Sequence, residues 1–395
     1  MTVGPVDGCR RATATGGRTL MLTPGAHGAM QITGITQHHL THQLDGAFEP
    51  TWIPGYPQGV HELELFEVET DAGITGITAS PSFAGGLDYA DALSVFLAGE
   101  DPHDVEGILR KLDAVDLVGP RPWHVELALW DIIGKDAGKP VYELLGAAAE
   151  PIPVYASTGE AQPADERLPY VETRIEEGFE AVKLRVESPG DIETVRGVRE
   201  AFPELTLMVD ANKGWSVRVA REEERWSFAD ALGFARGLEE VGDVAWLEEP
   251  LPRHDYRGYA RLRKKTDVPI AGGEFNDGPH QFREFVQQES LDVLQPDAAL
   301  ATGIKRGTEV AAMADLHGLE FVPHTWTNGV GFAANLHVMA AADSAWCEYP
   351  FEPPWTPAVR DFLLTDTIEH DGGYIEPPSG PGLGIEIDRS VLDEG

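Results

Sequence analysis

Three carboxylates in the second half of the chain each follow a short apolar stretch. Asp210 closes LTLMVD, Glu248 lies in VAWLEEP, and Glu274 closes PIAGGE. If these stretches are neighbouring strands, the three charges converge and repel one another strongly unless a cation neutralises them. Oxygen ligands suit a hard cation, and a partly open octahedral site suits Mg²⁺. A single such carboxylate is most often a solvated loop charge, but three at matched spacing predict a Mg²⁺ site.

Two further polar residues adjoin these carboxylates. Asn212 follows Asp210 by two positions, and Glu249 directly follows Glu248. Neighbouring residues of a strand point to opposite faces, so only one of the two glutamates can face the cavity. We predict that Glu248 is the ligand, and that Glu249 and Asn212 support the ligands or contact the substrate.

A carboxylate and an imidazole end the next two stretches of this kind. Asp297 closes DVLQPD and His324 closes EFVPH. A carboxylate beside an imidazole fixes the tautomer of the ring and raises its basicity, which makes a general base or acid. A histidine without such a partner is more often a structural residue. The matched spacing of Asp297 therefore favours a catalytic pair.

The stretch AVKLR carries two cations. Lys183 and Arg185 lie at positions i and i+2, on one face of a strand. A lysine can act as a base if its pKa is depressed, whereas an arginine keeps its proton and suits binding a carboxylate or stabilising an anion. The structural alternative is an ion pair with the ligand carboxylates. With a metal and a base nearby, these cations fit metal-assisted removal of a proton next to a carboxylate.

Seven stretches of this kind follow one another at steps of 23 to 38 residues. Their polar groups are, in chain order, Lys183, Asp210, Glu248, Glu274, Asp297, His324 and Glu348. A TIM barrel uses about 30 residues per strand–helix unit, and the C-terminal ends of its strands point into one mouth. From residue 151 the pattern alternates between strand and helix, which favours a parallel sheet with covering helices. We therefore predict a barrel over 151–352 that gathers these groups in one cavity.

The N-terminal part has a different pattern. Residues 30–80 read as strands, including a hairpin around the turn DAG, and residues 88–146 read as helices. We predict an α+β domain over 30–150 and a C-terminal tail, 353–395, that packs back on it. Residues 1–29 are predicted to be a disordered extension.

The loop 45–59 is rich in proline, glycine and aromatic residues. It is either a packed surface loop or a lid, in which Trp52, Tyr56 and His61 could close over a ligand. We expect this loop and residues 81–87 to determine substrate specificity.

Charge restricts the partners of the chain. Its 395 residues include 66 acidic and 30 basic residues, for a formal net charge of −36. Such a surface repels nucleic acid and anionic lipid. The charge indicates high solubility or, more specifically, adaptation to a salt-rich cytoplasm, where screening weakens self-repulsion. The strong preference for arginine over lysine fits the second interpretation.

The cell compartment follows from what the sequence lacks. It has no run of 18 apolar residues for a membrane span and no apolar core for a signal peptide in its first residues. Two cysteines, Cys9 and Cys347, give no disulfide framework. We therefore expect a cytoplasmic protein that has no membrane partner.

Taken in order, these motifs resemble the enolase superfamily and its mandelate racemase subgroup. The resemblance covers about residues 30–390 and rests on VELALWDIIGK, AVKLR, MVDAN, WLEEP, GGE, QPD, PHTW and CEYP. It implies an α+β capping domain over a modified (β/α)₇β TIM-like barrel. It also implies a Mg²⁺ site at the three carboxylates, a catalytic dyad of His324 and Asp297, and a homo-oligomer. Glu348 matches a carboxylic acid that is hydrogen-bonded to the substrate carboxylate.

One residue departs from the pattern of this subgroup. Lys183 and Arg185 match a KxK motif whose second lysine is the base for one substrate face in mandelate racemase, so Arg185 argues against two-base racemisation. Chemistry at one face needs only His324, and many members of the subgroup are acid-sugar dehydratases. The resemblance therefore implies dehydration of a sugar acid to a 2-keto-3-deoxy acid.

Three alternatives remain. The nearest is a racemase or epimerase of a 2-hydroxy acid, in which Lys183 or Arg185 would be the second base. A cycloisomerase is less favoured, because the dyad and Glu348 follow the mandelate racemase pattern. The last is a catalytically silent metal-binding scaffold, which the retention of ligands, dyad and cations together disfavours.

Overall fold

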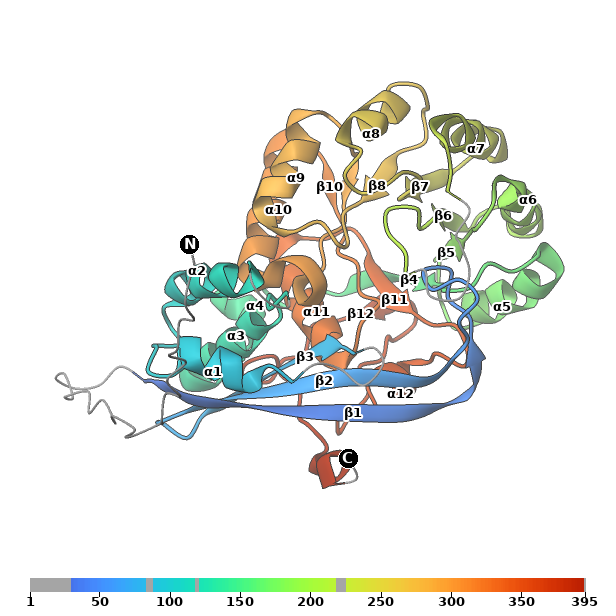
Figure 1. Cartoon of the computed structure of the whole chain (residues 1–395). Helices are drawn as coiled ribbons and strands as arrows, with labels where there is room; N and C mark the ends of the chain where they lie inside the picture. Colours follow the sequence, from blue (N-terminus) through green and yellow to red (C-terminus); the bar gives the residue numbers. More distant parts are fainter. Residues whose placement is uncertain (1–29, 83–87, 118–120, 218–224, 394–395) are drawn as a thin grey trace, which may run out of the picture.

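A computed structural model describes residues 30–82, 88–117, 121–217 and 225–393 of the chain (Figure 1). The predicted extension 1–29 lies outside the described residues. A curved antiparallel sheet and a group of short helices lie beside a barrel whose strands are surrounded by helices (Figure 1). No helix in these ranges combines the length and the apolar composition that a bilayer crossing needs.

The N-terminal sheet has the strand order β1-β2-β3. Its strands are β1 (Ile32–Phe48), β2 (Gln58–Thr70) and β3 (Thr75–Pro81). The expected hairpin joins β2 to β3, and its turn includes Gly73 with a positive φ of 75°. Helices α1 (Ala90–Leu97), α2 (Val105–Asp116), α3 (Val125–Ala137) and α4 (Val141–Leu144) follow.

Helix α3 lies unusually close to strand β3. A Cβ atom at Gly76 would be 2.1 Å from the carbonyl oxygen of Ala128, so a glycine is needed where the two elements cross. Apolar residues of the sheet and helices, including Phe66, Leu112 and Leu129, form one buried cluster there. This packing makes the N-terminal part a second layered unit beside the barrel.

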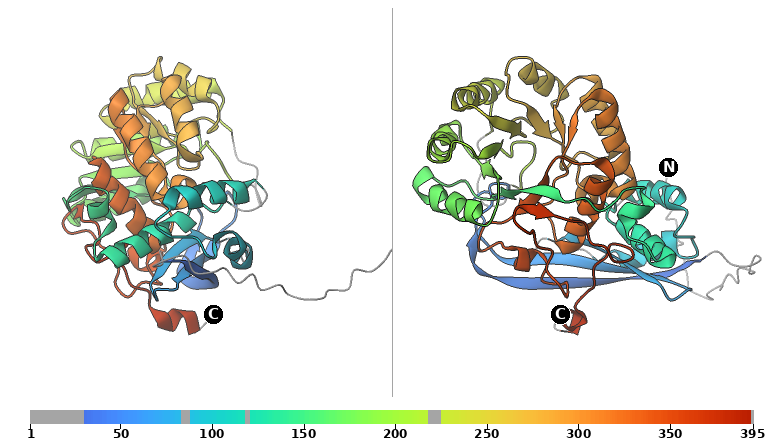
Figure 2. Two further views of the ribbon diagram at one scale, coloured as in Figure 1. Left: turned by 90° about the vertical axis from the view of Figure 1, so that its left-hand side faces the viewer. Right: turned by 180° about the vertical axis from the view of Figure 1, so that it is seen from behind.

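In the described residues of the barrel, eight strands alternate with seven α-helices, as the fold prediction required. The parallel strands are β4 (Ile152–Ser157), β5 (Ala181–Arg185), β6 (Thr206–Asp210), β7 (Val244–Glu248), β8 (Ile270–Gly272), β9 (Val293–Leu294), β10 (Glu320–Phe321) and β11 (Cys347–Pro350). The helices are α5 (Ala164–Glu176), α6 (Ile192–Ala201), α7 (Phe228–Val241), α8 (Tyr256–Arg263), α9 (Gly278–Gln287), α10 (Gly303–His317) and α11 (Gly329–Ala342). The two rotated views show these helices around the outside of the strands (Figure 2).

The sheet order runs from β11 through β4 to β10, and side chains join its two ends. The Ser344 hydroxyl lies 2.8 Å from the carbonyl oxygen of Phe321 on β10 and 2.9 Å from that of Trp346, next to β11. The Thr325 hydroxyl donates to the carbonyl of Glu348 at 2.8 Å. These contacts hold His324 and Glu348, on opposite sides of the seam, near each other.

An apolar layer fills the barrel below its polar mouth. The buried residues Tyr155, Ala181, Met208, Trp246, Ala271, Val293 and Val322 form a cluster that draws on seven consecutive strands or strand ends. Lys183, Asp210 and Glu248 each lie two positions after a member of this cluster, so they point to the same side of the sheet one step higher. Strand alternation therefore places the polar groups directly above a closed core.

The C-terminal tail contacts both parts of the molecule. It contains α12 (Pro357–Arg360), β12 (Tyr374–Ile375) and a final 3₁₀ turn, and β12 pairs antiparallel with β4. The backbone N–H of Leu383 donates to Asp131 of α3 at 2.9 Å, and Arg389 pairs with Glu67 of β2 at 2.6 Å. The domain limits at 150 and 352 stay predictions.

Candidate active site at the barrel mouth

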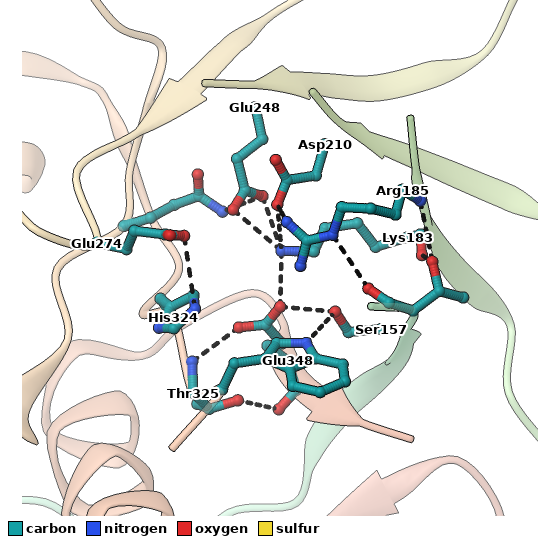
Figure 3. Close-up of polar contacts among 12 residues, drawn as sticks. Ser157, Lys183, Arg185, Asp210, Glu248, Glu274, His324, Thr325 and Glu348 are labelled. Atoms are coloured by element: carbon teal, nitrogen blue, oxygen red, sulfur yellow. Dashed lines mark hydrogen bonds and ion pairs between the residues drawn. The ribbon is translucent and has the colours of Figure 1, made fainter. Parts of the chain in front are cut away.

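The three predicted metal ligands come together at the end of the barrel. Asp210 and Glu248 are the last residues of β6 and β7 and stand opposite each other in register, and Glu274 follows β8. Each residue offers an oxygen, these oxygens all lie within 4.8 Å of one another, and all three residues are buried. Figure 3 shows the three side chains directed toward one point. This donor set fits a hard divalent cation.

Lys183 lies in the middle of these acids. Its Nζ is 3.0 Å from both carboxylate oxygens of Glu248 and 3.5 Å from Asp210 Oδ2, and it is 2.6 Å from Glu348 Oε1. Burial alone would lower the pKa of Lys183, but the three carboxylates outweigh it and raise that pKa. The ion pair that the sequence left open is therefore present. With only protein groups around it, Lys183 does not have the depressed pKa that would make it a base.

Arg185 is held as a cation by its surroundings. Its Nη1 pairs with Asp210 Oδ2, its Nε donates to the carbonyl of Thr158 at 3.3 Å, and its guanidinium lies 5.1 Å from the ring centre of Trp52. Burial would lower the pKa of Arg185, but Asp210 and the other acids raise it. Arg185 can thus stabilise a negative charge but cannot remove a proton.

Asp297 and His324 form the expected contact. His324 Nδ1 is 2.8 Å from Asp297 Oδ2, and His324 Nε2 is 3.5 Å from Glu274 Oε2. The other oxygen of Asp297 accepts from the backbone of Ala299 at 2.7 Å and from the amide of Asn335 at 3.2 Å. Burial would lower the pKa of His324, but the neighbouring carboxylates raise it to about 10. The ring presents Nε2 toward the acidic triad (Figure 3).

The surroundings of Glu348 favour its ionised form. Its Oε1 accepts from the Ser157 hydroxyl at 2.7 Å, and its Oε2 accepts from the backbone N–H of Thr325 at 2.7 Å. Burial would raise the pKa of Glu348, but Lys183 and His324 lower it to about 2. The family resemblance implied a carboxylic acid here. Two cations face this carboxylate and favour its ionised form where no substrate carboxylate lies beside it, so the carboxylic acid stays a prediction for the substrate complex.

Glu249 and Asn212 have different surroundings from the triad. Both have left-handed backbones, with φ of 42° and 49°. Both Glu249 carboxyl oxygens are buried without a hydrogen-bond partner, and burial together with Glu274 and the other acids raises the pKa of Glu249 well above its usual value. Asn212 donates its backbone N–H to Asp210 Oδ1 at 2.7 Å. An oxygen of Glu248, and not one of Glu249, belongs to the group that converges with Asp210 and Glu274, which supports Glu248 as the ligand.

The three predicted lid residues line one cavity of about 390 Å³. Trp52 packs edge-on against Trp326 with 5.2 Å between ring centres, and Tyr56 is 44% exposed. His61 is only 6% exposed and belongs to strand β2, because this strand begins at Gln58. His61 is therefore part of the fixed wall of the cavity, not of a mobile loop.

Sequence reasoning missed several polar residues of the site. Gln295 donates to Glu248 Oε2 at 2.9 Å, Trp215 Nε1 donates to Glu274 Oε1, and Ser157 and Thr325 hold Glu348. Gln295 lies two positions before Asp297, and Ser157 pairs in register with Lys183. A search for uncharged polar residues at the same strand ends could have found both.

Comparisons with known proteins agree with this geometry. A family profile described as "Enolase C-terminal domain-like" matches residues 169–391, and one described as "Mandelate racemase / muconate lactonizing enzyme, N-terminal domain" matches residues 58–146. The D-galactarolactone cycloisomerase of Agrobacterium fabrum is 33% identical over 92% of this chain and 98% of its own length. The arabinonate dehydratase of Saccharolobus solfataricus is 29% identical over 87% of this chain and 92% of its own length.

A solved structure extends this similarity to a complex. The L-talarate dehydratase of Polaromonas sp. JS666, solved with Mg and L-glucarate, superimposes with a TM-score of 0.76 and 27% identity. The match covers 92% of this chain and 97% of the other.

Proposed function

Since the chain belongs to the enolase superfamily and to its mandelate racemase subgroup, we propose that it is a Mg²⁺-dependent sugar-acid dehydratase. It would remove the proton next to the substrate carboxylate and release a 2-keto-3-deoxy acid. The observation that carries this proposal is the position of His324. Its Nε2 faces the buried acidic triad at 3.5 Å from Glu274 Oε2, while Asp297 holds Nδ1 on the other side of the ring.

Asp210, Glu248 and Glu274 would hold the metal ion. Their converging oxygens are all from carboxylates, as Mg²⁺ prefers. When bound there, the ion would supply positive charge beside the substrate carboxylate and so favour the negative charge that develops on its oxygens. Burial, and then Glu274 and the other acids, raise the pKa of the neighbouring Glu249 well above its usual value, which indicates that protein groups alone do not balance the charge of these acids.

The remaining polar groups would position and polarise the substrate. Lys183 and Arg185 bring two cations to the same mouth and would stabilise the developing anion from the side opposite His324. Glu348, held by Ser157 and the backbone of Thr325, would face the substrate carboxylate. A hydrogen bond between these two groups requires a proton, so substrate binding would favour the carboxylic acid form of Glu348.

A single histidine can carry out both proton transfers of the elimination, one from C2 and one to the leaving hydroxyl. A cation at the triad would offset Glu274, which raises the pKa of His324, and would so favour the neutral ring. The neutral Nε2 then takes the proton from C2, and the electron pair of that C–H bond forms an enolate. The electrons then return to form the C2–C3 double bond of an enol, and the C3 hydroxyl leaves as water with the proton from His324. The enol loses its hydroxyl proton and gains a proton at C3, which gives the 2-keto-3-deoxy acid.

Cycloisomerisation is the second candidate, because one relative with 33% identity carries that name. Cycloisomerisation, like dehydration, passes through an enolate. It does not, however, form a 2-keto-3-deoxy acid from an open-chain acid. Racemisation needs a base on each face of the substrate, and Arg185, which keeps its proton, occupies the position of the second base.

The test is to incubate the protein with Mg²⁺, concentrated KCl and a panel of five- and six-carbon sugar acids in D₂O. Proton NMR and an assay for 2-keto acids read the outcome. A new 2-keto-3-deoxy acid from one substrate would support the dehydratase. Loss of the C2 proton signal without a keto acid would contradict it and indicate racemisation or epimerisation, and a new ring product from a lactone would indicate cycloisomerisation.

We also propose that the protein works in a salt-rich cytoplasm as a homo-oligomer. The net charge of −36 supports the first part. The second part rests on analogy with the family.

A further inference from the structure

A cavity lies between the N-terminal sheet and the barrel mouth, and its wall is rich in aromatic side chains. Its volume is about 390 Å³, within the range of small-molecule sites. The rings that line it include Phe48, Trp52, Trp215, Phe275, Trp326 and Trp355.

The cavity adjoins the proposed catalytic groups. Trp215 donates to Glu274, and Trp326 Nε1 donates to the Ser157 hydroxyl at 2.8 Å, which in turn donates to Glu348. A substrate whose carboxylate end lies at the triad would therefore extend its other end into this cavity.

The charge of the cavity wall differs from that of the barrel mouth. Within the described part of the chain, the wall contains no lysine or arginine, and Glu62 adds a carboxylate. The one histidine, His61, is buried, and its burial together with the nearby His42 lowers its pKa to about 3. His61 is therefore uncharged at neutral pH. No group of the described wall could neutralise a second carboxylate of the substrate.

Three residues of the wall each carry a buried polar atom without a hydrogen-bond partner. These atoms are His61 Nε2, Ser82 Oγ and Trp355 Nε1. A buried polar group left without a partner is unfavourable. All three are uncharged, and after small side-chain rotations they could pair with hydroxyl groups of a ligand. The aromatic rings beside them would pack against the C–H bonds of such a ligand.

We propose that this cavity receives the uncharged, hydroxylated end of a monocarboxylic sugar acid and excludes the second carboxylate of a dicarboxylic sugar acid. His61, Ser82 and Trp355 would bind the hydroxyls, and Glu62 would repel a carboxylate. This inference rests on the proposed function, because it takes the reacting carboxylate to lie at the triad. The relatives leave the choice open, since one is named for arabinonate, a monoacid, and one structure contains L-glucarate, a diacid.

The test compares matched pairs of acids that differ only at the far end, such as D-gluconate with D-glucarate and D-galactonate with galactarate. Binding to the Mg²⁺-loaded protein in concentrated KCl is read by intrinsic tryptophan fluorescence, because several tryptophans line the cavity. The same titrations in His324→Asn avoid consumption of the ligand. We expect at least one monoacid to bind about 100-fold more tightly than its diacid, since juxtaposed like charges are strongly unfavourable.

A charge reversal in the wall tests the cause of this preference. Glu62→Lys should shift the ratio of diacid to monoacid affinity by at least about 10-fold toward the diacid. The matched control is Glu200→Lys, which makes the same charge change at an exposed position on the outer helix α6. Glu62→Gln, a milder change, should shift the ratio in the same direction by a smaller factor.

The outcomes separate the two proposals. The cavity assignment is overturned if a diacid binds as tightly as its monoacid, if no monoacid of the panel binds, or if Glu62→Lys and Glu200→Lys shift the ratio equally. A monoacid that binds in preference but yields no keto acid would leave the cavity assignment standing and contradict the dehydratase.

Discussion

Asp297 and His324 are joined by a 2.8 Å contact between Asp297 Oδ2 and His324 Nδ1. Asn335 and the backbone N–H groups of Ala299 and Leu300 all donate to the other Asp297 oxygen. Because these donors hold Asp297 Oδ1, Asp297 Oδ2 is kept in place to accept the proton on His324 Nδ1. Nε2 is then the nitrogen that is left to exchange a proton with substrate.

Replacing this histidine should remove the proposed acid–base group. His324→Asn keeps a polar side chain but has no basic nitrogen, so we expect turnover to fall by at least about 100-fold. The measurement is the rate of keto-acid formation at saturating substrate and Mg²⁺, with Mg²⁺ binding followed separately by calorimetry. A variant that binds Mg²⁺ and retains a near wild-type rate would move the base to Lys183.

Removing one proposed ligand should abolish metal-dependent activity. Glu274→Gln replaces a charged oxygen donor by a neutral one and leaves two carboxylates at the site, so Mg²⁺ affinity should fall steeply. The measurement is activity as a function of Mg²⁺ concentration. Glu249→Gln is the matched comparison, because Glu249 is an equally buried neighbour that is not part of the triad. Full activity of Glu274→Gln at limiting Mg²⁺ would refute the assignment.

The polar mouth of the barrel could be predicted because strand alternation and spacing are local properties. Lys183, Asp210 and Glu248 each follow an inward-pointing apolar residue by two positions, and that pattern is visible in the sequence. The ionisation state of Glu348 could not be predicted in this way. It depends on Lys183, which is far away in the sequence but 2.6 Å away in space.

The structure of the cavity wall was also only partly predictable from the sequence. The loop 45–59 and a strand on each side of it were expected from the sequence, but β1 runs to Phe48 and β2 starts at Gln58, so the connection is shorter than expected. The partners of Glu348 are also set by the seam between β10 and β11, which involves residues from separate strand–helix units. Such contacts arise only when the barrel closes.

A buried histidine should make the folded state sensitive to acid. His337 in α11 accepts from the backbone N–H of Tyr142 at 3.3 Å through Nδ1, and its Nε2 donates to the carbonyl of Leu383 at 3.1 Å. It thereby joins the barrel to α4 and to the C-terminal tail. Burial lowers the pKa of His337 from 6.5 to about 4, because it disfavours the charged ring, and a second ring proton would face the N–H of Tyr142.

The sign of the pH effect follows from this lowered pKa. Between pH 6.5 and 4 the unfolded chain binds a proton at His337 that the folded chain does not, so stability falls as the pH falls through this window. From pH 7 to 5 the loss from this one group is about 2 kcal/mol. His337→Gln should weaken the pH dependence of unfolding by about that amount in urea titrations, whereas His280→Gln, at an exposed position, should not. Equal slopes in both variants would contradict the prediction.

The excess of acidic residues should make stability depend on salt. At a net charge of −36, self-repulsion opposes the compact state, and 1 M salt shortens the screening length to about 3 Å. We therefore expect the thermal unfolding midpoint to rise by several degrees between 0.1 and 2 M KCl. Sucrose at matched osmolarity is the control, since it is excluded from protein surfaces but screens no charge. If sucrose raised the midpoint as much as KCl did, exclusion from the surface rather than screening would account for the stabilisation, and the proposed salt adaptation would lose its physical basis.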